Sequence, residues 1–112
     1  GIAMAHSKRI VSIIDRYIKE LKNRGIYPEK VILFGSYAYG KQRRYSDVDL
    51  LIISSDFKGM NLRERLELLG LIAGRILEPV ECLGYTKQEI KNRVKDSFLD
   101  EIYRNGMEIY LN

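Results

Sequence analysis

Two short apolar runs, joined by a polar segment that begins with glycine and ends with two aspartates, most constrain how this chain folds. Residues 31–34 lead into Gly35, and Asp47 and Asp49 lead into residues 50–53. Apolar runs of this length predict buried strands, which places both aspartates at the mouth of the second strand. Residues two apart in a strand point to the same face, roughly 6.6 Å apart along the backbone. The two carboxylates can therefore converge on one cation, or on two cations about 3.5–4 Å apart.

Two long amphipathic helices are predicted from apolar residues at helical spacing. The first covers about residues 7–24, with Ser7 as its cap and Gly25 as its stop. The second begins after Asn61, because Glu64 follows three residues later and completes a capping-box pattern. Its core-facing side is expected to consist of Leu62, Leu66, Leu69, Ile72, Ala73 and Ile76.

The rest of the pattern alternates strands with shorter helices. A short helical turn is expected after Gly35, a helix start at Thr86, and a last helix from Asp96 to Asn105, closed by Gly106. Strands are predicted at about residues 30–34, 48–54, 80–85 and 107–111. Strands separated by helices indicate an α/β or α+β fold, and the length indicates a single domain over residues 1–112.

Composition and charge exclude several classes of protein. One cysteine and one histidine rule out an internal disulfide and argue against a zinc cluster. The formal net charge of +4 suits an anionic ligand but does not by itself indicate nucleic acid as a direct substrate. No apolar run approaches the length of a membrane span and no signal peptide opens the chain, so we expect a cytoplasmic protein without a membrane partner. Residues 1–5 are interpreted as a tag remnant or a disordered lead, with Met4 as the natural start.

A third carboxylate, Glu81, lies inside the third predicted strand. Period two puts Val80 and Cys82 on one face of that strand and Glu81 on the other, where a charge is costly unless it is paired or bound. If this strand neighbours the second, Glu81 meets Asp47 and Asp49 at one point. Oxygen ligands of this kind favour Mg²⁺ or Mn²⁺ over zinc or copper. Two such ions would clamp a nucleoside triphosphate and lower the pKa of an attacking hydroxyl.

The segment between the two strands is suited to binding phosphate. Gly35 and Ser36 would let backbone amides and a hydroxyl approach phosphate oxygens closely. The loop that follows is basic, and Arg43, Arg44 and Ser46 are assigned with them to nucleotide binding. These pieces suit in-line displacement at a phosphorus atom, where catalysis consists mainly of positioning and charge neutralisation.

Each piece alone also has a purely structural interpretation. A Gly-Ser pair after a strand is commonly a turn, and two spaced aspartates are commonly a helix cap or loop charges. Glu81 alone can be an edge residue that faces water, and the basic loop can simply be solvated. The conjunction of these features, in this order and at this spacing, favours a reaction site.

The chain resembles a known superfamily in these residues. Gly35-Ser36, ten residues and then Asp47-x-Asp49 resemble the signature of the nucleotidyltransferase superfamily that includes DNA polymerase beta. From the first helix to the residues after Gly106, the chain is similar to the smallest branch, the minimal nucleotidyltransferases or MNT proteins. The resemblance implies a small mixed sheet flanked by helices, with ATP and two Mg²⁺ ions, or Mn²⁺, bound at the motif and Glu81 as the third carboxylate.

The resemblance also implies a partner and an activity. MNT proteins typically pair with HEPN-domain proteins as toxin–antitoxin systems in which the MNT member is the antitoxin, and some transfer AMP from ATP to a tyrosine of that partner. Two positions depart from the family: Tyr39 stands where arginine is frequent, and Glu81 is one methylene longer than the usual aspartate. These departures put one phosphate or partner contact, and the strength of the catalytic base, in question.

Three functions are compatible with the sequence. The first is a metal-dependent nucleotidyltransferase that acts on a hydroxyl of a partner protein, because the catalytic core occupies the whole chain and leaves no second domain for another acceptor. The second is a catalytically weak or inactive binding subunit that neutralises or regulates its partner sterically. The third is a nucleotidyltransferase for a small molecule. The sequence is compatible with either a homo-oligomer or a hetero-complex.

Overall fold

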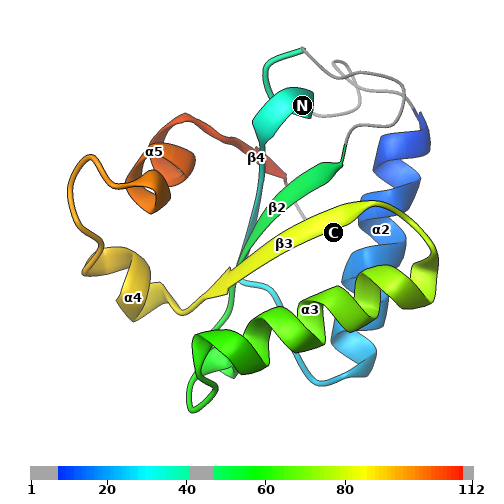
Figure 1. Ribbon diagram of the computed structural model, residues 1–112, viewed down its shortest axis with the longest axis horizontal. Helices are drawn as coiled ribbons and strands as arrows, with labels where there is room; N and C mark the ends of the chain where they lie inside the picture. The colour runs from blue at the N-terminus through cyan, green and yellow to red at the C-terminus, as the bar shows by residue number, and fades with distance from the viewer. Residues whose placement is uncertain (1–7, 41–46, 110–112) are drawn as a thin grey trace.

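The computed structural model describes residues 8–40 and 47–109 of the chain. The expectations for Ser7, for residues 1–5, for Arg43, Arg44 and Ser46, and for the end of the last strand beyond residue 109 fall outside these ranges. The elements, in order, are α2 (Lys8–Asn23), β1 (Lys30–Phe34), η1 (Gly35–Tyr37), β2 (Val48–Ile53), η2 (Ser55–Phe57), α3 (Leu62–Ile76), β3 (Val80–Tyr85), α4 (Lys87–Lys91), α5 (Phe98–Asn105) and β4 (Met107–Ile109) (Figure 1). Within the described ranges, no helix has the length and apolar character needed to cross a bilayer.

The four strands form one mixed sheet in the order β3-β2-β1-β4. β1 pairs antiparallel with both β2 and β4, and β2 pairs parallel with β3. The register aligns Phe34 of β1 with Asp49 of β2, and Asp49 with Glu81 of β3. The small mixed sheet flanked by helices that the sequence predicted is confirmed.

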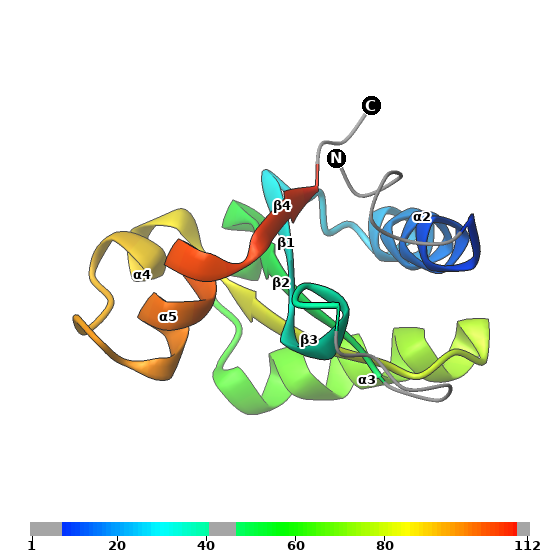
Figure 2. The same cartoon turned by 90° about the horizontal axis from the view of Figure 1, so that it is seen from above.

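Helices cover both faces of the sheet. Figure 2 shows α4 and α5 on one side of the strands and α2 and α3 on the other. The strand side chains alternate accordingly: Leu50 and Ile52 of β2 join the cluster under α2 and α3, whereas Leu51 and Ile53 join the cluster under α4 and α5. Because β2 is buried on both faces, its sequence reads as a continuous apolar run rather than an alternating one.

The predicted helix signals form as expected at three positions. Gly25 follows α2 with φ +86°, a conformation that suits glycine. Asn61 and Glu64 complete a reciprocal capping box at the start of α3, with both hydrogen bonds at 2.8 Å. Thr86 and Glu89 do the same for α4. Each cap satisfies backbone N–H groups that have no partner within the helix.

The predicted core face of α3 is partly wrong. Leu62 and Leu66 are more than half exposed, and the buried residues of α3 are Arg65, Leu69 and Ile72. Periodicity alone selected the leucines, but a buried arginine occupies the inward position of the first turn. Leu62 and Leu66 are therefore left open to solvent at the start of α3.

The last helix also differs from the prediction at its ends. It begins at Phe98 with Ser97 as its cap, because Asp96 has a left-handed backbone (φ +62°) that a helix cannot contain. Gly106 ends it with φ −73°, so the glycine is not needed for a left-handed turn. A Cβ at position 106 would lie 2.3 Å from Cγ2 of Ile32, and this close approach to β1 is what requires glycine.

Candidate active site

Two of the three predicted carboxylates meet on adjacent strands. Asp49 and Glu81 occupy paired positions on β2 and β3, on the side of the sheet where Leu51 and Leu83 pack below α4 and α5. Asp49 is partly buried, whereas Glu81 is exposed because β3 is an edge strand. Asp47 is exposed and directly precedes β2.

The electrostatics of Asp49 show that the three carboxylates influence one another. The pKa of Asp49 is raised to about 6, first by partial burial, then by the negative charges of Glu81 and Asp47, and last by a hydrogen bond with Glu81. Carboxylates that share a site in this way need a proton or a cation to coexist. The position therefore favours binding of a positively charged group.

Gly35 lies directly against the carboxylate of Asp49. Its backbone has φ +71°, and a Cβ at this position would lie 2.2 Å from Oδ2 of Asp49. No other residue fits, both because the conformation is left-handed and because the carboxylate fills the space. Gly35 opens the short η1 turn, in which the N–H of Ala38 donates to the carbonyl of Gly35 at 3.1 Å, and Ser36 follows it, partly exposed. The structure thus brings the phosphate-binding candidates and Asp49 together.

A cavity of about 640 Å³ opens from these carboxylates between α3 and α5, and we call it the acidic trough. Its floor is formed by β1, η1, β2 and β3, one wall by α3 and the other by α5. The contribution of α5 was not foreseen, because nothing in the sequence relates residues 98–102 to the Asp-x-Asp motif. The trough is lined by Phe34, Gly35, Tyr39, Asp49, Leu66, Gly70, Val80, Glu81, Cys82, Leu83, Phe98, Glu101 and Ile102.

Glu81 also borders a second, shallower hollow of about 450 Å³. This hollow contains Asp47 and lies against the C-terminal end of α3, at Gly74 and Leu77. The side chain of Glu81 is therefore shared between the two depressions, with Asp49 in one and Asp47 in the other.

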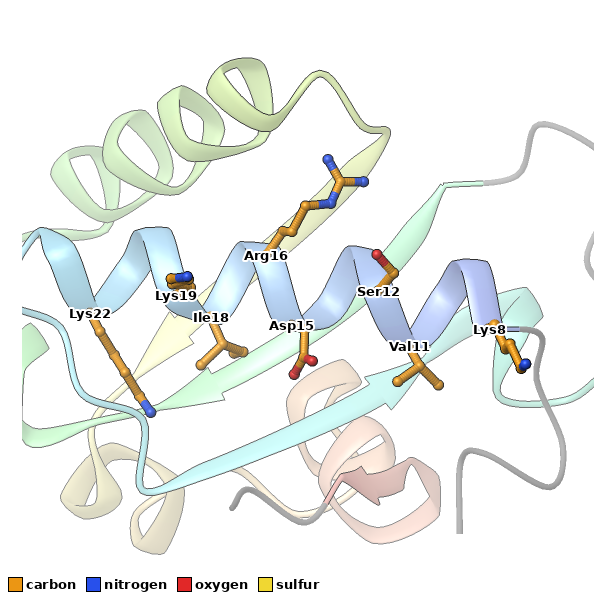
Figure 3. Close-up of a pocket in the computed structure, with 8 residues that line it drawn as sticks. All are labelled: Lys8, Val11, Ser12, Asp15, Arg16, Ile18, Lys19 and Lys22. Atoms are coloured by element: carbon orange, nitrogen blue, oxygen red, sulfur yellow. The ribbon is translucent and has the colours of Figure 1, made fainter.

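A further groove of about 680 Å³ runs along α2 and contains none of the predicted site residues (Figure 3). Figure 3 shows Asp15 pointing away from α3 and Arg16 pointing towards the connection between α3 and β3, where it pairs with Glu78. The groove is bordered by Lys8, Lys19 and Lys22 and shares no described lining residue with the acidic trough. Its chemistry is that of a solvated helix face.

The donor chemistry of the site suits a hard divalent cation. Asp47, Asp49 and Glu81 offer only oxygen ligands, and the pKa of Asp49 is raised first by burial and then by the negative charges of Glu81 and Asp47. Over residues 8–40 and 47–109, no three or more His, Cys, Asp or Glu side chains form a ready-made metal cluster. Mg²⁺ is commonly held by one or two carboxylates together with substrate phosphates, and the paired Asp49 and Glu81 fit that pattern.

Comparison with known proteins assigns this chain to a family. A family model described as the nucleotidyltransferase domain matches residues 14–104, which include η1, both aspartates and Glu81. The chain belongs to this nucleotidyltransferase family. The identification of an enzyme of this class from its sequence motif is confirmed.

Two curated relatives match this chain over nearly their whole length. This nucleotidyltransferase is 34% identical over 103 residues to a putative protein adenylyltransferase of Methanocaldococcus jannaschii, covering 89% of the chain and 98% of the relative. It is also 34% identical over 99 residues to the protein adenylyltransferase MntA of Thermococcus cleftensis, covering 83% and 98%. The similarity to the MNT branch recognised in the sequence is confirmed.

Two solved structures share the fold. A putative nucleotidyltransferase from Sulfolobus solfataricus aligns with a TM-score of 0.59 and 28% identity, over 79% of this chain and 76% of the other. A toxin–antitoxin solved with AMP-PNP aligns with a TM-score of 0.60 and 22% identity, over 86% and 71%. The second likeness concerns the fold alone.

Proposed function

We propose that this nucleotidyltransferase transfers AMP from ATP to a hydroxyl group of a partner protein. The observation that carries the proposal is the contact between Gly35 and Asp49, beside Glu81, because it places a glycine turn and paired carboxylates at one point. Glycine turns suit phosphate oxygens, and paired carboxylates suit the metal ions that accompany a triphosphate.

Each residue has a defined role in this proposal. Gly35 and Ser36 hold the β- and γ-phosphates, and Arg43, Arg44 and Ser46 contribute further contacts to the nucleotide. Asp47, Asp49 and Glu81 hold two Mg²⁺ ions, for which Mn²⁺ can substitute; when bound, these ions neutralise the triphosphate and lower the pKa of the attacking hydroxyl. Glu81 accepts the proton of that hydroxyl. The acceptor oxygen then bonds to the α-phosphorus, the bond to the β-phosphate breaks, and pyrophosphate leaves.

The proposed acceptor is a toxin of the HEPN class, with this chain as its antitoxin. Both curated relatives carry the name protein adenylyltransferase, and one structural neighbour is a toxin–antitoxin solved with AMP-PNP. These names support a protein acceptor rather than a small molecule. The pair would form a hetero-complex in which the toxin supplies the hydroxyl.

The test is incubation with labelled ATP and Mg²⁺, with and without a co-expressed HEPN-domain toxin. We expect label on the toxin, and its loss by at least 100-fold in Asp49→Asn. The matched control is Asp15→Asn on α2, which removes an equal charge at a residue remote in sequence from the motif and outside both depressions. Transfer that persists unchanged in Asp49→Asn would refute the proposal.

A second function, steric neutralisation by a binding subunit, is favoured by one observation. Three leucines of α3 and its C-cap are largely exposed. The exposed fractions are 55% for Leu62, 54% for Leu66 and 87% for Leu77. Leu62 and Leu66 are neighbours one turn apart on α3, and contiguous exposed apolar side chains are typical of a surface that a partner covers. Retained neutralisation of the toxin by the double variant Asp47→Asn/Asp49→Asn, in the absence of label, would decide for the steric function.

A further inference from the structure

The acidic trough leads away from the phosphate-binding turn, and we propose that it binds the acceptor protein through a basic segment that carries an apolar side chain. Glu101 of α5 is the residue that selects the positive charge. This inference rests on the proposed function, since it names the chemistry of the acceptor for the same reaction.

The charges of the trough are of one sign. Its charged lining residues are Asp49, Glu81 and Glu101, and no described lining residue is basic. This local sign opposes the net charge of the chain, which is +4. Because the proposed function assigns Asp49 and Glu81 to metal ions, Glu101 is the described lining charge that remains to attract a basic group of the partner.

Glu101 is available for a partner. Within the described ranges its carboxylate has no hydrogen bond or ion pair, and the residue is exposed. The preceding Asp100 is, by contrast, buried and accepts hydrogen bonds from Arg93 and Arg104 at 2.8 and 3.0 Å. It also accepts from the N–H of Asp96 at 2.8 Å. Asp100 thus anchors the first turn of α5 and fixes the direction in which Glu101 projects.

The walls of the trough offer an apolar contact beside this charge. Leu66 of α3 and Phe98 of α5 line opposite walls and expose 54% and 67% of their surface. Phe98 packs edge-on against Phe34, with 6.2 Å between the ring centroids, so its ring is held in place although it is open to solvent. Large apolar side chains exposed at an opening suit contact with an apolar side chain of a partner.

The same features disfavour a nucleotide at the α5 end of the trough. A phosphate placed there would meet Glu101 without a described basic residue to offset its charge. In the proposed function the phosphates and the metal ions lie at the other end, at Gly35, Asp49 and Glu81, and the end at Glu101 remains for the group that attacks the α-phosphorus. An acceptor segment with lysine or arginine near its hydroxyl is complementary in both charge and polarity.

The experiment compares two probes of opposite charge as acceptors: a random copolymer of lysine and tyrosine, and one of glutamate and tyrosine. With labelled ATP and Mg²⁺, we expect the KM for the basic copolymer to be about tenfold lower. Glu101→Gln should raise this KM by up to roughly fivefold while the KM for ATP stays constant, because one charge pair at an exposed site is removed. Phe98→Ala should raise the KM for both copolymers.

The matched control is Glu67→Gln, which removes an equal charge from the exposed face of α3, where Glu67 pairs with Arg63. It should leave both KM values unchanged. A rise in the KM for ATP in Glu101→Gln would assign the trough to the nucleotide and overturn the inference. Equal affinity for both copolymers, or a preference for the acidic one, would overturn it as well.

Failure of the proposed function can be recognised separately. If neither copolymer is labelled, fluorescence anisotropy with the same two copolymers, dye-labelled and without ATP, still measures binding. A preference for the basic copolymer that Glu101→Gln removes would support the trough as a docking site while refuting transfer. Absence of that preference would refute the docking site itself.

Discussion

The carboxylate of Asp49 fills the space in which any residue other than glycine would carry its side chain at position 35. The distance from an ideal Cβ at Gly35 to Oδ2 of Asp49 is only 2.2 Å. The turn after β1 and the carboxylate of β2 are therefore fitted to each other, and the conformation of one restricts the other. The position of the proposed phosphate-binding turn is in this way coupled to that of the proposed metal ligand Asp49.

Gly35→Ala is expected to abolish nucleotide transfer. The new methyl group would displace the carboxylate of Asp49, and the left-handed backbone would add about 1 kcal/mol of strain. Labelled-ATP transfer and the free energy of unfolding measure the two effects. The control is Gly25→Ala, where φ is +86° but a Cβ would meet nothing within 4 Å. It should lose only the stability that the strained backbone costs, which is less than Gly35→Ala loses, and should keep its activity; equal activity of the two variants would contradict the prediction.

Asp49→Asn is expected to stabilise the metal-free protein while removing activity. The shift of the pKa of Asp49 from 3.8 to about 6 corresponds to roughly 3 kcal/mol, which partial exposure reduces to roughly 1 kcal/mol. Because the folded-state pKa is raised, the stability associated with the protonated carboxyl is fully present below about pH 4 and is lost as the pH rises through 6.

The difference between wild type and Asp49→Asn should therefore be small at pH 4 and largest above pH 7. Thermal unfolding in the presence of a chelator measures it, and about 1 kcal/mol corresponds to about 4 °C in Tm for a domain of this size. Added Mg²⁺ should raise the Tm of the wild type and not that of the variant. A stability difference that does not change with pH would show that burial and the neighbouring carboxylates do not raise the pKa of Asp49.

Arg65→Met is expected to destabilise the fold by about 3 kcal/mol. The guanidinium is buried and makes five hydrogen bonds, two of them to Glu89 and the others to the carbonyls of Phe57, Met60 and Gly84. Its removal takes a donor from each of these three carbonyls, of which that of Phe57 still accepts from the N–H of Met60 at 3.0 Å. Urea unfolding measures the loss.

The control for Arg65 is another arginine of α3. Arg63→Met breaks a solvent-exposed pair with Glu67 and should change stability by less than about 0.5 kcal/mol. Similar losses in both variants would mean that the network around Arg65 contributes no more than a surface pair.

Tyr17→Phe is expected to cost about 1 kcal/mol. The hydroxyl of Tyr17 is buried and donates to the carbonyl of Leu69 at 2.7 Å, which joins α2 to α3. Burial also raises the pKa of this hydroxyl, so the group stays neutral at all relevant pH values. Tyr27→Phe, at an exposed position, is the control and should be neutral. Equal Tm values for the two variants would contradict the prediction.

Local signals in the sequence predicted most of the elements correctly. The ranges of β1 and β3 agree with the predicted strands, because unbroken or alternating apolar residues indicate directly which side chains are buried. The caps at Asn61 and Thr86 were predictable because their hydrogen bonds join residues three apart. The neighbouring positions of Asp49 and Glu81 were predicted only on the condition that their strands are adjacent, and the register confirms that condition.

Long-range relationships were not available from the sequence. The buried Arg65 is indistinguishable by periodicity from a solvated residue, and only its partners on η2, β3 and α4 explain why α3 is rotated. The trough wall formed by Phe98 and Glu101 depends on how α5 packs on the sheet, which no local pattern encodes. The left-handed backbone of Asp96 was equally not predicted, although aspartate is among the residue types enriched in that conformation.

Because β3 is an edge strand, its carboxylate Glu81 has more room for a change in side-chain length than Asp49 of the adjacent β2. Glu81 lies on the outermost strand and faces solvent, so a side chain one methylene longer or shorter requires no repacking there. Asp49 is enclosed between β1 and β3 and confined by Gly35, so its length is dictated by its surroundings. A glutamate is thus accommodated at position 81 because it stands at an edge of the sheet. A change in side-chain length should be tolerated at this outer carboxylate and not at the inner one, Asp49.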